Sequence, residues 1–219
     1  MDVVLIGAGG HGRVVLDILR TAGVHQPIGF LDADPQLTGQ IVDGLPVLGQ
    51  VNLLTKLRAE KISGAIVSIG DNHARRSYAR KLAERGFELI NAVHPNSQIS
   101  TTARIGRNVV IASGAIVGTA ACVADHVIVN TAAIIDHECE VAEAAHLCPG
   151  SILAGRVRIG PAAFIGLGAK IIQCLKIGEN ATVGAGAVVL TDVPDGQTVV
   201  GVPAKILSKH SVTLQPIGV

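Results

Sequence analysis

The sequence predicts a Rossmann-like α/β half domain followed by a parallel β-helix. Three observations lead to this fold class. A branched aliphatic residue recurs at every sixth position through the second half of the chain, and a glycine-rich turn joins an apolar segment to an amphipathic one near the N-terminus. The chain is also 48% hydrophobic with only 2% aromatic residues, which suits a narrow core built from Val, Ile, Leu and Ala.

The six-residue repeat is the strongest signal. A period of six fits neither an α-helix, at about 3.6 residues per turn, nor a plain alternating strand. It fits a short strand and a turn, repeated, with three such units in one triangular coil and coils stacked about 4.8 Å apart. One coil cannot bury its own inner face, so the array must be long. The sixteen consecutive repeat positions, expected to point inward, are Ile99, Ile105, Ile111, Val117, Val123, Val129, Ile135, Val141, Leu147, Leu153, Ile159, Ile165, Ile171, Ile177, Val183 and Val189.

The N-terminal segment reads as strand, glycine turn and helix. Residues 3–6 form an apolar run, Gly7–Gly12 is glycine-rich, and residues 14–19 have helical periodicity. Glycines allow a close approach to phosphate, and the first N–H groups of the helix point at it. A second strand at residues 28–31 ends at Asp32, where an acid can bind a ribose hydroxyl.

This spacing also satisfies the fingerprint of NAD-dependent oxidoreductases. A full dinucleotide fold needs two mononucleotide-binding halves. Only one further clear buried strand, residues 65–69, precedes the repeats, with a helix near 72–85 and a short strand near 87–91. The turn therefore favours a nucleotide-diphosphate group, with His11 placed to touch phosphate or sugar. Gly70, in the loop after residues 65–69, should face the same crevice.

His94-Pro95 and the start of the repeat mark a domain junction. We expect a nucleotide-sugar-binding domain over residues 1–94, a β-helix with its C-terminal cover over 95–207, and a tail over 208–219.

The bulk properties narrow the partners. The formal net charge of +1 gives no electrostatic reason to expect nucleic acid or anionic membrane as a partner. No apolar run is long enough to span a bilayer, and the N-terminus has no signal-peptide pattern. The four cysteines show no metal-type or redox spacing, so we expect reduced thiols in a cytoplasmic protein.

Bulky polar residues are concentrated at one expected corner of the β-helix. His137 lies between Asp136 and Glu138 and should project outward, because it follows an inward Ile by two residues. It can act as a general base beside a carboxylate, or it can be a solvated surface histidine, and the residues alone leave both open. His126 and His146 cannot join His137 on one ion within a single chain, so no metal is expected.

The whole chain resembles the NeuD/PglD-like family of bacterial sugar acyltransferases, and is most similar to the UDP-4-amino-sugar N-acetyltransferases of bacillosamine type. The matching segments are Gly7–Gly12, Phe30–Asp32, Ser68–Asn72, Asn130–Ala132, Asp136–Cys139, His146–Gly150 and Gly201–Lys205. The resemblance implies a left-handed β-helix, a homotrimer with active sites between neighbouring chains, and acetyl-CoA as donor. The implied acceptor is a nucleotide-linked 4-amino-sugar, of UDP type in the best-matched members and of GDP or dTDP type in others, so the base stays open. It also implies a place in the synthesis of surface-glycan or protein-glycosylation precursors.

The resemblance also implies roles for individual residues. His137 matches the general base, and Glu138 matches the residue that raises its basicity. The acceptor contacts would be Gly9, Gly10, His11, Asp32, Ala33 and Gly70, and the acetyl-CoA contacts His146, Gly155, Leu167 and Ala185. Ala33 stands where close members have a second acid, and Ala185 replaces a glycine. Two alternatives remain: a sialic acid O-acetyltransferase, and a nucleotide-sugar-binding trimer without catalysis.

Overall fold

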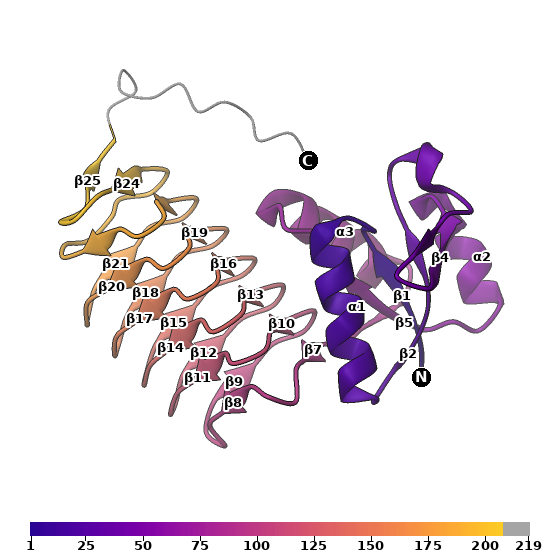
Figure 1. Ribbon diagram of the computed structural model, residues 1–219, viewed down its shortest axis with the longest axis horizontal. Coiled ribbons are helices and arrows are strands. Elements are labelled where there is room, and N and C mark those ends of the chain that lie inside the picture. The colour runs from indigo at the N-terminus through magenta and orange to yellow at the C-terminus, as the bar shows by residue number, and fades with distance from the viewer. Residues whose placement is uncertain (208–219) are drawn as a thin grey trace.

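The computed structural model describes residues 1–207 and contains the two predicted parts side by side (Figure 1). The fold class expected from the sequence is confirmed: an N-terminal Rossmann-like half domain is followed by a left-handed parallel β-helix. The expected tail, residues 208–219, lies outside the described residues.

The N-terminal domain is built on a six-stranded sheet with the order β3-β4-β2-β1-β5-β6. Its strands are parallel except for β3, which runs antiparallel to β4 at one edge. Strand β1 lies between β2 and β5, so the chain order reverses there and a crevice opens at the carboxyl ends of these strands. The bounds are β1 (Asp2–Ile6), β2 (Gln26–Leu31), β3 (Ile41–Val42), β4 (Leu45–Gly49), β5 (Gly64–Val67) and β6 (Glu88–Leu89).

Helices cover both faces of this sheet. On one face α1 (Gly10–Ala22) buries Val15, Leu16 and Leu19 against the strands. On the other face α2 (Leu54–Ala59) and α3 (Asn72–Glu84) bury Leu57 and Leu82. Short 3₁₀ turns lie at Pro35–Leu37 and Val51–Leu53. None of the helices in residues 1–207 combines the length and the apolar character that crossing a bilayer requires.

The sequence pattern did not predict strand β4 or helix α2. β4 contains Pro46 and ends at Gly49, two residues that speak against an interior strand. Pro46 is tolerated because the strand lies next to the sheet edge and pairs only with the two-residue β3 on that side. Parallel pairing to β2 nevertheless adds β4 to the sheet, with Val47 buried.

The β-helix has three sheets, one on each side of the prism. The domain-facing sheet contains β7 (Ala92–Val93), β10 (Val110–Ile111), β13 (Ile128–Val129), β16 (His146–Leu147), β19 (Phe164–Ile165), β22 (Thr182–Val183), β24 (Thr198–Val200) and β25 (Lys205–Ile206). The isoleucine sheet contains β8 (Gln98–Ile99), β11 (Ile116–Val117), β14 (Ile134–Ile135), β17 (Ile152–Leu153), β20 (Lys170–Ile171) and β23 (Val188–Val189). The charged sheet contains β9 (Arg104–Ile105), β12 (Cys122–Val123), β15 (Glu140–Val141), β18 (Arg158–Ile159) and β21 (Lys176–Ile177).

The register explains the six-residue period. Strands pair with residues eighteen positions later, as Val110 does with Ile128 and Val129 with Leu147, so one coil takes three repeats. The inward residues form one continuous core along the prism. The ladder begins with β7, whose Val93 lies one step of six before Ile99.

The corners hold a feature that the sequence does not reveal. From Asn108 to Gly186, one residue in each corner has a positive φ, and most of these residues are not glycine. Such a backbone costs an L-residue about 1–2 kcal/mol, which the stacked coils must offset. The series also has a period of six: Asn108, Gly114, Ala120, His126, Ala132, Glu138, Ala144, Gly150, Arg156, Ala162, Gly168, Cys174, Asn180 and Gly186.

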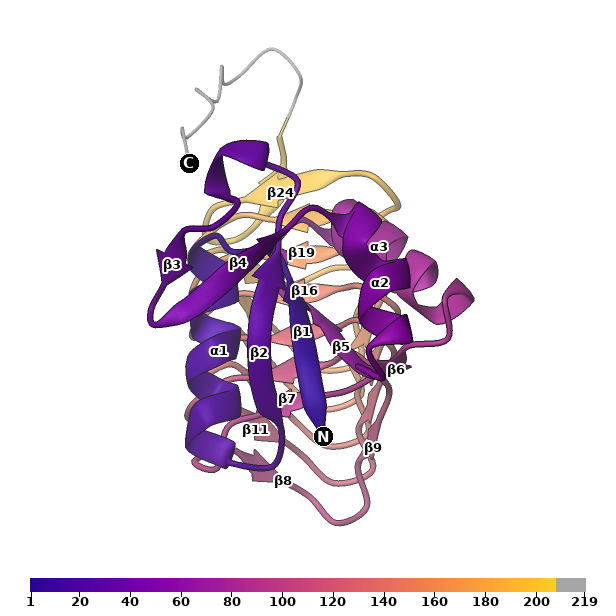
Figure 2. The same ribbon diagram turned by 90° about the vertical axis from the view of Figure 1, so that its right-hand side faces the viewer.

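The two parts share a hydrophobic core. Ala92, Val110 and Ile128 project from the domain-facing sheet and pack with α1. Figure 2 shows the N-terminal sheet and its helices in front of the stacked coils. The crevice of the N-terminal domain is thereby held against the coils that follow β13.

Candidate functional site

A cavity of about 530 Å³ lies at the carboxyl ends of β1, β2 and β5. Its walls come from three loops that are far apart in sequence and that meet because these strands are parallel. All six residues predicted to contact the acceptor line it: Gly9, Gly10, His11, Asp32, Ala33 and Gly70. The structure therefore brings this predicted group together.

The glycine turn is open to an anion. Gly9 is the N-cap residue of α1, and no side chain in the described part of the chain caps the helix, so its first backbone N–H groups remain available. A Cβ atom at Gly9 or Gly10 would meet nothing within 4 Å. At Gly12 a Cβ atom would overlap the carbonyl of Gly7, so this glycine is needed for the close contact between helix and strand.

Asp32 is held by two backbone groups. The N–H of Ala8 donates to Oδ2 at 2.7 Å, and the N–H of Asp34 donates to Oδ1 at 2.9 Å. The carboxylate thus ties the glycine turn to the end of β2. Each oxygen keeps a free lone pair, so the group can still accept a hydrogen bond from a ligand hydroxyl.

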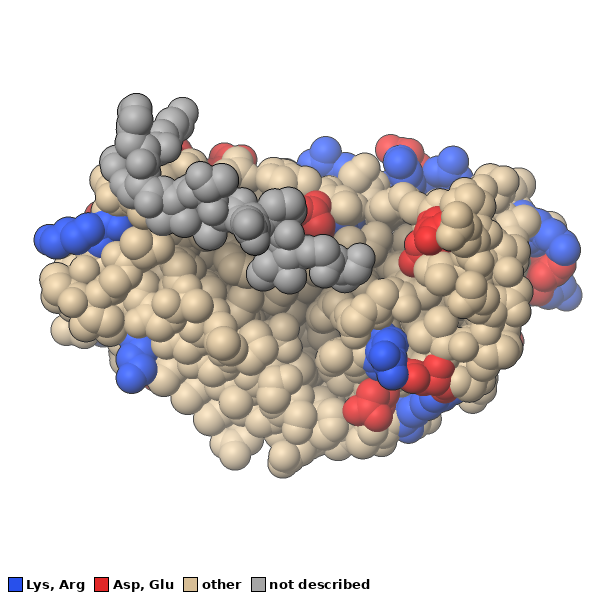
Figure 3. All heavy atoms as spheres, turned by 45° about the horizontal axis from the view of Figure 1, so that its top comes forward, with Lys and Arg blue, Asp and Glu red and all other residues tan. Residues whose placement is uncertain are grey.

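A second cavity, of about 510 Å³, continues the first toward the β-helix. Gly70 and Asp71 line both cavities, and the far wall is formed by His146, Phe164 and Thr182 of the domain-facing sheet. Figure 3 shows a mostly uncharged face that is hollowed between the two parts of the molecule. One cleft therefore runs from the glycine turn to the β-helix wall.

His11 and His146 face each other across this cleft. Their ring centroids are 6.3 Å apart, and the edge of His146 packs on Phe164 at 5.3 Å. Asn130 Nδ2 lies 3.3 Å from His146 Nε2. Among residues 1–207, His11 Nε2 and His146 Nδ1 are buried without a hydrogen-bond partner. Such orphaned nitrogens fit a site whose ligand supplies the missing polar atoms.

Burial keeps both imidazoles neutral. It lowers the pKa of His11 to about 4, helped by the charge of Arg75. Burial, again with help from Arg75 and then His11, lowers the pKa of His146 to about 3. Neutral imidazoles can donate from one nitrogen and accept at the other.

These shifts predict a dependence of stability on pH. In the unfolded chain histidine has a pKa near 6.5, so between pH 6.5 and about 4 the unfolded state binds more protons than the folded state. The free energy of unfolding should therefore fall as the pH drops through this window. Urea denaturation at pH 7 and pH 4.5 should show a smaller loss for the double variant His11→Gln, His146→Gln than for the wild type. The exposed His73, changed to Gln, is the control, and equal losses in all three proteins would contradict the prediction.

His137 lies at the corner between the isoleucine and charged sheets, with its side chain half exposed. Its Nδ1 is 3.2 Å from Glu138 Oε2, so Nδ1–H donates to the carboxylate and Nε2 keeps its lone pair. The N–H of His137 also donates to Asp136 Oδ1 at 2.7 Å. The ring lies over Gly155 of the next coil, where a Cβ atom would overlap it.

Arg156 is a contact that the sequence reading missed. Its Nε donates to Glu138 Oε2 at 2.7 Å, so this oxygen serves both Arg156 and His137. Hydrogen bonds from Arg156 and then His137 lower the pKa of Glu138. An eighteen-residue separation from Glu138 is the only sequence signal for this pair.

The predicted donor residues do not form one cluster within the chain. His146 lies on the domain-facing sheet, and Leu167 and Ala185 are exposed at the corner between that sheet and the isoleucine sheet. Gly155 lies under His137, at the corner opposite the domain-facing sheet. A triangular prism separates these positions, so one chain presents two halves of the predicted site.

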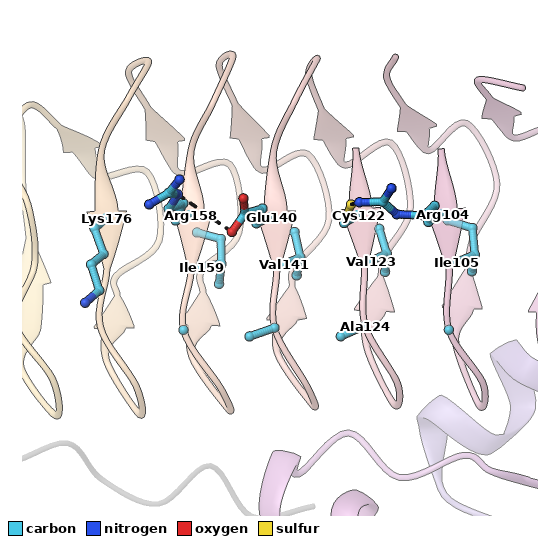
Figure 4. A pocket seen from close by; sticks show the side chains of 13 residues that line it. Arg104, Ile105, Cys122, Val123, Ala124, Glu140, Val141, Arg158, Ile159 and Lys176 are labelled. Carbon is cyan, nitrogen blue, oxygen red and sulfur yellow. Dashed lines mark hydrogen bonds and ion pairs between the residues drawn. The ribbon is translucent and has the colours of Figure 1, made fainter. Parts of the chain in front are cut away.

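Another hollow, of about 730 Å³, follows the charged sheet and contains none of the predicted residues (Figure 4). Arg104 lies beside Cys122, and Arg158 Nε is 3.6 Å from Glu140 Oε2. Exposed ion pairs of this kind contribute little stability, and the row reads as a solvated sheet face.

The four cysteines are free thiols in the structure. Burial raises the pKa of Cys148 to about 11 and also raises that of Cys139, so neither is a ready nucleophile. Within residues 1–207, no three His, Cys, Asp or Glu side chains are grouped so as to hold a metal ion.

The chain matches a family model and several solved structures. Residues 2–82 match the PglD N-terminal domain family. The chain is similar to a histidine-to-alanine variant of GDP-perosamine N-acetyltransferase from Caulobacter crescentus, solved in complex with CoA and GDP-perosamine. The two are 41% identical with a TM-score of 0.92, over 95% of this chain and 97% of that one.

A second solved structure is the acetyltransferase domain of PglB from Neisseria gonorrhoeae in complex with acetyl coenzyme A. It is 39% identical with a TM-score of 0.88, over 94% of this chain and 98% of that one. A curated relative, the uncharacterized protein L142 of Acanthamoeba polyphaga mimivirus, is 33% identical over 116 residues. That match covers 53% of this chain, and the chain spans about a fifth (21%) of the length of this relative.

Proposed function

Because the chain belongs to the PglD/NeuD-type family of sugar N-acetyltransferases, we propose that it transfers the acetyl group of acetyl-CoA to the 4-amino group of a nucleotide-linked amino sugar. The observation that carries the proposal is the continuous cleft from the glycine turn to His146. Its uncapped helix N-terminus suits a diphosphate, and its buried, unpartnered imidazole nitrogens suit polar groups of a sugar or thioester.

The diphosphate site separates this function from acetylation of a free sugar. An acceptor such as sialic acid does not need an uncapped helix N-terminus beside Asp32. The sequence leaves UDP, GDP and dTDP open as the nucleotide, and the solved complex of one relative with GDP-perosamine supports GDP. A role in surface-glycan or protein-glycosylation precursor synthesis follows from this acceptor class.

His137 is the general base in the proposed reaction. The amine nitrogen attacks the thioester carbonyl, the C–N bond forms and the C–S bond breaks. The proton lost by the amine goes to His137 Nε2, because Nδ1 is engaged by Glu138. The CoA thiolate leaves and is protonated in turn. No covalent enzyme intermediate is needed, because a thioester is already activated.

His137 and the acceptor cleft lie on different sides of one chain, and this separation supports a homotrimer. His137 of one chain would meet the cleft of a neighbour along the seam between prisms. The isoleucine sheet offers the contact face, since Ile116, Ile134 and Ile152 project outward from it and are partly exposed. The expected particle mass in solution is three times the 22.4 kDa of one chain.

The decisive experiment measures free CoA release with a panel of UDP-, GDP- and dTDP-linked 4-amino-sugars, with free and CMP-linked sialic acid as competing acceptors. We expect release with one nucleotide amino sugar and none with sialic acid. The His11→Ala variant should raise the KM for that acceptor about tenfold and leave the KM for acetyl-CoA nearly unchanged. Two outcomes would overturn the proposed function: CoA release with sialic acid alone, and no CoA release with any acceptor of the panel.

A further inference from the structure

Arg75, on the first turns of α3, is buried completely. Burial lowers the pKa of Arg75 to about 10, so it stays protonated near neutral pH. Among residues 1–207, every group that accepts a hydrogen bond from it is a neutral oxygen, and no carboxylate is among them. The nearby Asp71 favours the protonated form of Arg75 through its charge but accepts no hydrogen bond from it among residues 1–207. Burying the guanidinium is therefore costly, and a function is the natural explanation for it.

One side of the guanidinium binds a corner of the β-helix. Nε donates to the carbonyl of His126 at 2.7 Å, and Nη2 donates to that of Ala144 at 2.8 Å. These carbonyls are one coil apart in the series of left-handed corner residues. The third carbonyl of the column, that of Ala162, accepts from Asn72 Nδ2 at 2.9 Å, and Asn72 Oδ1 accepts from Arg75 Nη2 at 2.8 Å.

The other side of the guanidinium binds the loop that lines both cavities. Nη1 donates to the carbonyls of Ile69 at 3.1 Å and of Gly70 at 2.9 Å. Nη2 also reaches the carbonyl of Ala145, the residue before His146, at 3.4 Å. A planar guanidinium has five donors in a fixed fork, which a flexible ammonium cannot reproduce. One rigid side chain therefore spans the distance between the acceptor loop and the coil that bears His146.

We propose that Arg75 is the positioning residue that sets the width of the acceptor cleft, by fixing the loop at residues 69–71 to two successive coils of the β-helix. The proposal rests on the proposed function, because it assigns the cleft to the nucleotide amino sugar. Its buried charge also faces His11 and His146 and helps to keep both neutral.

The neighbouring Arg76 is a matched control. Its Nη2 pairs with Glu143 Oε2 at 2.6 Å, so it also joins α3 to the same corner of the β-helix. This side chain is partly exposed, and among the hydrogen bonds of residues 1–207 none joins it to the loop at 69–71. Changing Arg76 to Met weakens domain docking alone, whereas changing Arg75 to Met or Lys also releases the loop.

The kinetic test compares these variants. We expect Arg75→Lys and Arg75→Met to raise the acceptor KM at least tenfold, with kcat reduced only a few-fold, and Arg76→Met to keep the acceptor KM within twofold. Asn72→Ala, which keeps the loop contacts of Arg75 but loses one anchor, should raise the acceptor KM about threefold. The proposal is overturned if folded Arg75 variants keep the wild-type acceptor KM, or if Arg76→Met raises that KM as much as they do. If the Arg75 variants do not fold, an unchanged acceptor KM in Asn72→Ala overturns it.

Two further readouts separate this proposal from the proposed function. The Kd values of UDP and GDP, measured by calorimetry, should rise in the Arg75 variants in parallel with the acceptor KM. Amide hydrogen exchange at residues 68–71 should be faster in Arg75→Met than in Arg76→Met. A wild-type protein that acetylates no amino sugar, yet shows this exchange difference, would overturn only the function. Equal exchange in the two variants would overturn the positioning role.

Discussion

Changing His137 to alanine is expected to lower kcat by roughly three orders of magnitude, within the range typical of a lost general base. The KM for acetyl-CoA should change by no more than a few-fold, because the ring removes a proton and does not hold the donor. Because Nδ1 is hydrogen-bonded to Glu138, Nε2 is the nitrogen that accepts the proton, and the alanine variant lacks this acceptor. Initial rates of CoA release at saturating donor and acceptor measure the effect.

His25 is the control histidine, because it lies outside both cavities of the cleft. His25→Ala should keep wild-type kcat. If His137→Ala retained more than a tenth of the wild-type kcat, His137 would be ruled out as the general base. Glu138→Gln should cost about tenfold, because it keeps a hydrogen-bond acceptor for Nδ1 but not the charge.

The same variant tests whether the site is shared between chains. His137→Ala and His11→Ala chains, unfolded and refolded together, should regain about a quarter of wild-type activity at low acceptor concentration. The reason is that half of the clefts keep His11 and half of the neighbouring chains keep His137. Activity equal only to the average of the two parents would place both residues in one chain's site.

Much of the fold could be predicted from the sequence, because a triangular coil demands one inward residue every six positions. The residues in that series are buried along the whole prism, apart from those of the first coil. The corner conformations could not be predicted. Alanine and arginine carry no local preference for positive φ, and only the stacking of coils imposes it at Ala132 or Arg156.

For a related reason, the sequence predicts the acceptor cavity but not the contacts that depend on domain docking. The acceptor residues follow strand ends, and parallel strands bring their carboxyl ends together, so the cavity could be inferred. The meeting of His11 with His146 depends on how the two domains dock, which no periodic pattern encodes. Arg75 and Arg76 are adjacent and alike in a polar helix, and only the docked structure shows that one is fully buried and the other partly exposed.

The second large loss of activity is expected when a methyl group is added at Gly155. Changing Gly155 to alanine should lower kcat about a hundredfold, because the added Cβ would occupy the space of the His137 ring and turn Nε2 away from its position. The backbone itself does not require glycine. The equivalent positions of other coils carry side chains: Thr101, Thr119 and Gln173. The glycine is therefore needed because the ring of His137, from the preceding coil, lies over it.

This reasoning predicts strong non-additivity between the two positions. In a His137→Ala background the space above the corner is empty, so adding Gly155→Ala should reduce kcat by no more than twofold. The stability follows the same logic, with Gly155→Ala lowering the urea midpoint of the wild type but not that of His137→Ala. If Gly155 instead served only as a backbone contact for acetyl-CoA, its substitution would raise the KM for acetyl-CoA equally in both backgrounds. The double-mutant cycle separates these two roles, because only steric support of the imidazole disappears together with the imidazole.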